Sequence, residues 1–295
     1  MKKKINDFGR KLRLIYRNLV LPVDYSGQEV SDKIFELLNS DKPIMICRFG
    51  SVELDAVKKI DLIEKGKLKF NKNDFFQLKN NAGFFPIEYE FLKKFHDRML
   101  EDMLKIDIYG QFSTIELYFS NLLRNKKKVR LSDLNPWEYE LPWSRILKGK
   151  KVLVVYPFEN SIKKQYKIRE KLFENQNILP KFDLITLKSV QSIGGNCESF
   201  SNWFDALKYM EDEISKIDFD IAIIGCGAYG LLLAAYIKQI GKKAIHLGSA
   251  TQILFGIKGK RWEESNFNYI NKYWIRPSKS ERPKGYKNVE NGCYW

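Results

Sequence analysis

Histidine is scarce in this sequence: the 295 residues include two, His96 and His246. A metal site built from several histidines is therefore excluded, and a Ser-His-Asp relay would have to use one of these two. The four cysteines lie far apart and form no C-x-x-C pair (Cys47, Cys197, Cys226 and Cys293). Two of them, Cys47 and Cys226, lie beside the ends of expected buried strands, which indicates free thiols in a reducing compartment.

Long apolar runs are also absent. The longest uncharged run, residues 221–237, is short for a membrane span and holds three glycines. The start of the chain, "MKKKINDFGRKLRLIYRNLVLP", has basic residues throughout and lacks the continuous apolar stretch of a secretory signal. No internal repeat or low-complexity tract is visible. We therefore expect a cytoplasmic protein.

Residues 1–22 form a basic segment that we treat as a separate unit. Apolar residues recur in it at helical spacing, among them Ile5, Phe8, Leu12 and Leu19, while lysine and arginine occupy much of the rest. This pattern is typical of a helix on an anionic membrane surface, and it predicts a peripheral position on the inner face of the cell membrane. An ordinary basic helix packed on the domain is the alternative.

The composition is that of a soluble globular protein, with 44% hydrophobic and 29% charged residues and a net charge of +15. Such a charge suits ligands that carry phosphate, anionic membrane surfaces or nucleic acid. The basic stretches lack an aromatic-interleaved recognition motif. We therefore expect no nucleic-acid partner, although a non-catalytic module that binds nucleic acid or membranes remains an alternative function.

Apolar strand-like runs alternate with helix-like segments, which predicts an α/β fold with a Rossmann-like, mostly parallel sheet. The expected strands lie in "PIMICRFG", "KKVLVVYPF", "FDLITLKSV", "FDIAIIGCG" and "KKAIHLG", with a further one in "VRLSDL". The middle, about 74–125, reads as helix-rich. We expect one domain over residues 23–276 and a polar, extended tail over 277–295. Ligands of parallel sheets bind beyond the carboxyl ends of the strands, so the residues after each strand are the candidates.

The turn from Gly225 to Gly230 has the G-x-G-x-x-G spacing of a dinucleotide-binding unit. That unit also needs an acidic residue at the end of the next strand to hold the ribose. The next strand, "KKAIHLGSA", offers no carboxylate there. The turn therefore does not support NAD binding. A methyltransferase that uses this turn for S-adenosylmethionine remains an alternative.

Two other strand ends carry groups suited to phosphates. In "CRFGSVELDAV", Arg48 precedes a helix that we expect to begin at Ser51, with Ser51 as its N-cap and Glu53 in its first turn; a helix N-terminus beside an arginine suits a diphosphate. In "GSATQILFGIKGKRW", glycines precede cations and an aromatic residue that could clamp a phosphate and stack on a sugar or base. The purely structural alternatives are that Glu53 only complements the dipole of its helix and that the second segment is a solvated basic turn. The loops "PFEN" and "VQSIGGNCES" are expected pocket walls.

The chain resembles the bacterial glycosyltransferases of the GT-D fold, found among capsule, O-antigen and glycoprotein assembly enzymes. The likeness spans about 28–262 and rests on "RFGSVEL", "NAGFFP", "LKGKKVLVVYPFENSI" and the long stretch from "FDIAIIGCG" to "GIKGKRW". In that family the turn reads F-G-D-G-E, and its Asp-x-Glu pair binds a divalent metal and the donor's diphosphate. Here Glu53 matches the glutamate, but Ser51 stands where the aspartate should be.

The resemblance implies transfer of a sugar from a nucleotide-sugar donor to a glycan acceptor, which could be lipid-linked. It implies Mn²⁺ or Mg²⁺ as a cofactor, a role that the Ser51 departure weakens, because a hydroxyl is a poor ligand for either ion. Glu53 would be the catalytic residue: it would bind the metal or, without a metal, orient donor hydroxyls or act as a base. The expected substrate-binding residues are Arg48, Phe49, Gly50, Ser51, Gly225, Gly227, Ala228, Tyr229, Gly248, Gln252, Lys258, Arg261 and Trp262.

Overall fold

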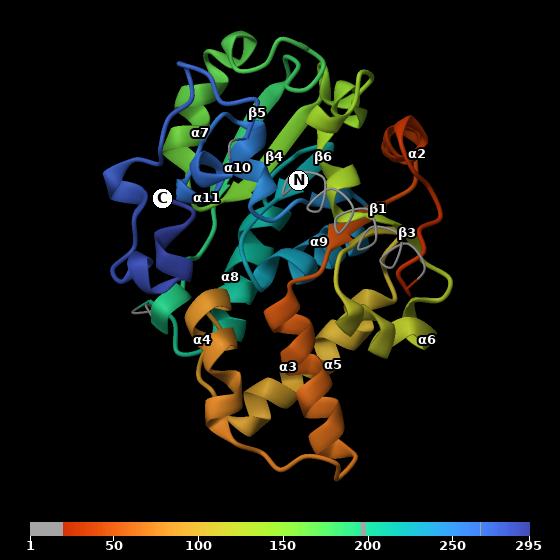
Figure 1. Cartoon of the computed structure of the whole chain (residues 1–295), viewed down its shortest axis with the longest axis vertical. Helices are drawn as coiled ribbons and strands as arrows, with labels where there is room; N and C mark the ends of the chain where they lie inside the picture. Colours follow the sequence, from red (N-terminus) through yellow and green to blue (C-terminus); the bar gives the residue numbers. More distant parts are fainter. Residues whose placement is uncertain (1–19, 196–198, 266) are drawn as a thin grey trace, which may run out of the picture.

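The computed structural model describes residues 20–195, 199–265 and 267–295, and in them seven strands form one parallel sheet (Figure 1). The strand order is β3-β2-β1-β7-β6-β4-β5. The strands are β1 (Ile44–Arg48), β2 (Ile108–Gln111), β3 (Lys127–Arg130), β4 (Lys151–Tyr156), β5 (Asp183–Lys188), β6 (Ile221–Ile224) and β7 (Lys243–His246). The expected Rossmann-like α/β fold is confirmed.

Helices cover both faces of the sheet, so each strand alternates its side chains between two apolar cores. Met45 and Cys47 of β1 face one core, and Ile44 and Ile46 face the other. On the first face lie α3 (Ser51–Glu64), α4 (Phe76–Ala82), α5 (Tyr89–Met103), α8 (Trp203–Ser215) and α9 (Tyr229–Gln239). On the second lie α2 (Gln28–Asn39), α7 (Glu159–Tyr166) and α10 (Ala250–Leu254). The short helices α6 (Ser120–Leu123) and α11 (Lys260–Glu264) complete the described set.

The middle of the chain differs from the sequence prediction. It contains a strand, β2, because the four residues Ile108–Gln111 are all buried between β1 and β3. The strand expected in "VRLSDL" lies earlier, at Lys127–Arg130, and a 3-10 turn, Leu131–Leu134, follows it. Helix α3 has Gly50 rather than Ser51 as its N-cap, and Ser51 is the first helical residue. The two differences in the strands concern short segments whose pattern of apolar residues is weak.

The C-terminal segment, 277–295, is folded onto the domain, and the prediction of an extended tail is wrong. It forms three 3-10 turns, Lys279–Glu281, Tyr286–Asn288 and Glu290–Gly292. Val289 and Trp295 are buried, and the Trp295 indole Nε1 donates to the carbonyl oxygen of Glu281 at 3.2 Å. The few apolar side chains of this segment are enough to anchor it beside α10 and α11 (Figure 1).

The order of the strands creates a switch point between β4 and β6. From β4 the chain passes through α7 to β5 on one side, whereas from β6 it passes through α9 to β7 on the other. Because the two connections diverge, a crevice forms above the carboxyl ends of these neighbouring strands. The strand order therefore predicts that a ligand binds at this edge of the sheet.

Three other expectations concern the start of the chain, membrane-spanning helices and the cysteines. The basic segment 1–22 lies almost entirely outside the described residues. Among the helices of the described residues, none has the length and apolar character needed to cross a bilayer. Cys47, Cys226 and Cys293 are buried free thiols.

Candidate functional site

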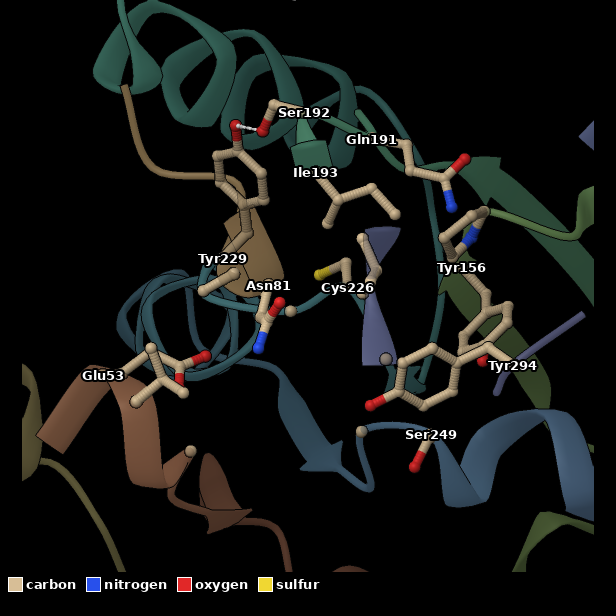
Figure 2. Close-up of a pocket in the computed structure, with 18 of the residues that line it drawn as sticks. Glu53, Asn81, Tyr156, Gln191, Ser192, Ile193, Cys226, Tyr229, Ser249 and Tyr294 are labelled. Carbon is tan, nitrogen blue, oxygen red and sulfur yellow. Dashed lines mark hydrogen bonds between the residues drawn. The ribbon is translucent and has the colours of Figure 1, made fainter. Parts of the chain in front are cut away.

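A cavity of about 200 Å³ opens at the carboxyl edge of the sheet, at the switch point (Figure 2). Residues at or just beyond the ends of five of the strands line it: Arg48 at the end of β1, Pro157 after β4, Gln191 after β5, Gly225 after β6 and Gly248 after β7. The end of α4 and the C-terminal segment close the remaining sides. Parallel strands bring these five loops to one edge, although up to two hundred residues separate them in the chain.

The cavity has an aromatic side and a polar side. Figure 2 shows Tyr156 and Tyr294 on one side and Glu53, Asn81 and Tyr229 on the other. The Tyr156 hydroxyl is held by Gln252 Oε1 at 2.8 Å, and the Tyr229 hydroxyl lies 2.9 Å from Ser192 Oγ. Both rings are therefore fixed by hydrogen bonds.

Groups with a positive charge or partial charge lie at the floor of the cavity. Helices α3 and α9 both begin there, so the positive end of each helix dipole faces the cavity, although the first two N–H groups of α9 already bond to the carbonyl oxygens of Cys226 and Gly227 at 3.3 and 3.1 Å. The Arg48 side chain also lines the cavity, with its Nε donating to the Phe49 carbonyl oxygen at 3.1 Å and its Cζ 5.3 Å from the Phe112 ring centroid. Burial lowers the pKa of Arg48, and nearby Glu53 opposes that shift. Two helix N-termini and a cation form a strong site for an anion.

Glu53 is the acidic residue closest to this positive floor. Its carboxylate folds back over Gly50, so closely that a Cβ at Gly50 would lie 1.8 Å from Glu53 Oε2. Burial is the main cause that raises the pKa of Glu53; its own backbone N–H and Arg48 oppose the shift, and Glu290 adds to it. A carboxyl group with a raised pKa is suited to exchange a proton near neutral pH.

Two other titratable side chains at the cavity, His246 and Cys226, are unsuited to act as a base or a nucleophile. Burial and the charge of Arg48 lower the pKa of His246 to about 3, so its imidazole is neutral and a poor base. Burial raises the pKa of the Cys226 thiol far above neutrality, so this side chain is not a thiolate nucleophile. A Ser-His-Asp relay through His246 is therefore not supported.

Most of the residues expected at the site line the cavity, and the rest lie behind or beside it. Those that line it are Arg48, Gly50, Ser51, Glu53, Gly225, Gly227, Tyr229 and Gly248. Phe49 and Ala228 are buried in the core, and Gln252 supports the wall from behind by bonding to Tyr156. Lys258, Arg261 and Trp262 lie outside the lining: Lys258 pairs with Glu263 at 3.2 Å, and Arg261 pairs with Glu290. The roles of all these residues stay predictions.

Sequence reasoning missed the C-terminal wall and Asn81. Glu290, Tyr294 and Trp295 line the cavity, and Arg261 stacks on Tyr294 with 4.8 Å between its guanidinium carbon and the ring centroid. The sequence feature that could have indicated this wall is the apolar run "CYW" in an otherwise polar tail. For Asn81, at the end of α4, no such signal exists, because its position depends on tertiary packing.

The donor set at the cavity does not match the metal site that the resemblance implies. Glu53 and Glu290 are the carboxylates in the lining, and Glu290 already pairs with Arg261. Within the described residues, no group of three or more His, Cys, Asp or Glu side chains is arranged to hold a metal ion. The chemistry of the site is therefore derived below from the protein's own side chains alone.

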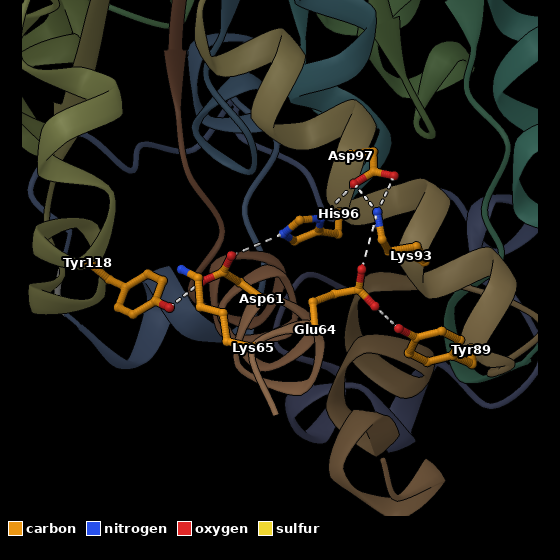
Figure 3. Close-up of polar contacts among 8 residues, drawn as sticks. All are labelled: Asp61, Glu64, Lys65, Tyr89, Lys93, His96, Asp97 and Tyr118. Atoms are coloured by element: carbon orange, nitrogen blue, oxygen red, sulfur yellow. Dashed lines mark hydrogen bonds and ion pairs between the residues drawn. The ribbon is translucent and has the colours of Figure 1, made fainter. Parts of the chain in front are cut away.

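Helix α3 carries Glu53, and polar contacts join its far end to α5 (Figure 3). Glu64 lies 3.7 Å from Lys93 Nζ and accepts a hydrogen bond from Tyr89. Asp61 accepts from Tyr118 and lies 3.9 Å from His96 Nε2. Most of these groups are partly exposed, so each contact adds little to stability.

Buried aromatic side chains connect α5 to α8 and α9. Phe95 of α5 is 1% exposed and packs edge-on against Trp203, with 5.4 Å between ring centroids. Trp203 in turn stacks on Tyr229 of the cavity wall at 4.5 Å, with the rings almost parallel. A continuous aromatic cluster therefore connects the α5 core to the cavity.

Residues 139–254 match the model of the GT-D fold-like domain. No curated protein and no solved structure matches the chain. The matched stretch covers β4 to β7 and the walls Tyr156, Gln191 and Gly225 to Tyr229, whereas Arg48, Glu53 and the C-terminal wall lie outside it. The resemblance inferred over 28–262 is thus supported for the second half of the sheet.

Removing the aromatic contact should cost far more stability than removing the polar ones. We expect Phe95→Ala to lose about 3–5 kcal/mol of unfolding free energy, because it leaves a cavity in a packed core. Lys93→Met should lose less than about 1 kcal/mol, because its ion pairs are partly exposed. Urea denaturation of the two variants measures both; equal losses would contradict this ranking of the contacts.

Glu53 should behave as a destabilising carboxylate at neutral pH. A folded-state pKa above the usual glutamate value means that the ionised form is less favourable in the folded protein, so stability falls as pH rises from the unfolded pKa through the folded one. Glu53→Gln should therefore be as stable as the wild type or more stable at pH 7. The difference should vanish below the usual glutamate pKa, where the wild-type carboxyl is protonated.

The matched control is Glu29→Gln, in the first turn of α2, where an exposed acid complements the helix dipole. This variant should lose about 0.3–1 kcal/mol at pH 7. Thermal melts from pH 4 to 8 compare the two variants. A loss for Glu53→Gln like that of Glu29→Gln would show that Glu53 is merely a dipole partner.

Proposed function

We propose that the protein is a glycosyltransferase that moves a sugar from a nucleotide-sugar donor to a glycan acceptor in surface polysaccharide or glycoprotein assembly. The observation that carries the proposal is the cavity itself. It lies at the switch point of a sheet with a GT-D fold-like domain, and it combines two helix N-termini and Arg48 with Glu53. Such a site fits a diphosphate beside a reacting carbon.

The two sides of the cavity suggest how the donor lies. The diphosphate would bind between Arg48 and the turn at Gly225–Gly227, where backbone N–H groups and the guanidinium supply donors. The base would lie toward the aromatic side at Tyr294, because flat rings stack on one another. The sugar would then point to Glu53 and Asn81 on the polar side (Figure 2).

The reaction follows from these positions. A hydroxyl oxygen of the acceptor bonds to the anomeric carbon of the sugar while the bond from that carbon to the phosphate oxygen breaks. The electron pair of the broken bond leaves with the nucleoside diphosphate, whose added negative charge Arg48 and the helix termini stabilise. Glu53 in its ionised form takes the proton of the hydroxyl, a role that its raised pKa favours.

A methyltransferase is the second candidate, since the turn at Gly225–Gly230 could also face an adenosyl donor. The end of β7 brings Gly248 and Ser249 to the cavity instead of a ribose-binding carboxylate. S-adenosylmethionine carries no phosphate, so the cation Arg48 in the lining favours the sugar-nucleotide donor. A nucleic-acid-binding role has no specific feature of the cavity in its favour.

The donor assignment predicts selective stabilisation by one class of nucleotide sugar. In a melting-temperature panel of UDP-, GDP-, CMP- and dTDP-sugars, with and without Mn²⁺, the matching donor at a hundredfold excess over its Kd should add about 2.7 kcal/mol of stability. Arg48→Met should lose this shift, and the exposed control Lys208→Met should keep it. Glu53→Gln should bind the donor but lose transfer by about 10²–10⁴-fold.

Other outcomes of the panel would contradict the proposal. A shift with S-adenosylmethionine and none with any sugar nucleotide would favour the methyltransferase. Full transfer by Glu53→Gln would remove this residue from the reaction.

The basic segment 1–22 leads us to propose that the enzyme binds reversibly to anionic membranes, beside a lipid-linked acceptor. Each lysine or arginine near an anionic leaflet contributes on the order of 1 kcal/mol, and seven of them stand against the single acid Asp7. Deletion of residues 2–22 should abolish sedimentation with anionic liposomes and spare donor binding. Equal sedimentation of the truncated and full-length chains would refute this role.

A further inference from the structure

A second hollow, an open groove of about 370 Å³, lies beside the cavity. It runs from the end of β5 to the C-terminal segment, and its walls include Lys188, Ser189, Val190, Gln191, Phe200 and Arg282. Val190 and Gln191 also line the cavity, so the two hollows share a wall. Figure 2 shows Gln191 on the cavity side of this wall, above Tyr156.

Two buried polar atoms of groove-lining residues have no hydrogen-bond partner among the described residues. They are Oγ of Ser189, a residue 2% exposed, and Nε of Arg282. Buried polar groups are nearly always paired, and an unpaired one costs about 1–3 kcal/mol. Both atoms can donate a hydrogen bond. Two such donors on one groove point to a ligand that carries acceptor oxygens.

The charges of the groove favour an anion. Within the described residues, neither Lys188 nor Arg282 forms an ion pair with a carboxylate. The acid of this segment, Glu281, is fully engaged, because its carboxylate accepts hydrogen bonds from Ser161 Oγ and from the backbone N–H groups of Asn160 and Ser278. These donors are neutral and leave the charge of Glu281 in place, so the groove lining holds two cations, Lys188 and Arg282, against one carboxylate.

We propose that this groove binds a phosphate group of the acceptor and thereby directs an acceptor hydroxyl over the Val190–Gln191 wall into the cavity. A phosphate offers several oxygens to the guanidinium fork, the ammonium group and the serine hydroxyl. Phe200, which packs on Tyr209 with 5.4 Å between ring centroids, supplies a half-buried apolar face for the rest of the acceptor. This inference rests on the proposed glycosyl transfer for the identity of the ligand, but the binding site can be tested without it.

The test is isothermal titration of the full chain with glucose 1-phosphate, with glucose as the uncharged reference. Arg282→Gln and Ser189→Ala should each raise the Kd for glucose 1-phosphate about tenfold, because each removes a hydrogen bond to a charged group. Arg282→Lys keeps the charge and should bind with an intermediate Kd. Lys279→Gln, an equal charge change on the same segment outside the groove, should stay within about twofold of the wild type.

The same titrations with decyl phosphate distinguish two sources of the phosphate. Tighter binding of decyl phosphate would assign the phosphate to a lipid linker, and tighter binding of glucose 1-phosphate would assign it to the sugar; both support the site. Wild-type affinity in Arg282→Gln and Ser189→Ala would overturn it, as would an equal loss in Lys279→Gln. Melting temperatures near that of the wild type verify that the variants are folded.

The Arg48→Met variant separates this inference from the proposed function. It should lose nucleotide-sugar binding at the cavity and keep the affinity for glucose 1-phosphate at the groove. If no nucleotide sugar binds the wild type but glucose 1-phosphate still depends on Arg282, glycosyl transfer is wrong and the groove site stands. If binding of glucose 1-phosphate depends on Arg48 and not on Arg282, the groove site is wrong.

Discussion

The common direction of the seven strands is the constraint on which the site depends. Because every strand is parallel to its neighbours, all the loops that follow the strands meet at one edge, and two of the helices that follow begin there as well. The charge of Arg48 and the carboxylate of Glu53 are brought to that edge at the cost of partial burial. A ligand that carries negative charge would relieve the unfavourable burial of Arg48.

The sheet was largely predictable, because its central strands β1, β4 and β6 are short and mostly apolar and alternate with helices. β4, β6 and β7 lie where the sequence placed them, since residues such as Val154 and Ile223 have no alternative to burial. β2 was not predictable, because the residues "IYGQ" show no clear period and are buried by their neighbours in the sheet. Local pattern therefore predicted the centre of the fold better than its edge.

The sequence predicted those lining residues of the cavity that lie at the ends of strands. Arg48 ends β1, Gly225 directly follows β6 and Gly248 comes two residues after β7, and all three line the cavity. The C-terminal wall depends on contacts across the fold, such as the hydrogen bond of 3.3 Å from Gln252 Nε2 to the Tyr294 carbonyl oxygen, and no local pattern encodes them. The same long-range packing places Arg282 beside the end of β5 and so creates the groove with a wall in common with the cavity.

The most direct test of the account is a crystal structure of the protein with its best-binding nucleotide sugar. The account predicts density for the diphosphate between Arg48 and the Gly225–Gly227 turn, with the base against Tyr294 and the sugar beside Glu53. A nucleotide bound away from this cavity, or with its diphosphate remote from Arg48, would contradict the central claim that this edge of the sheet is the donor site.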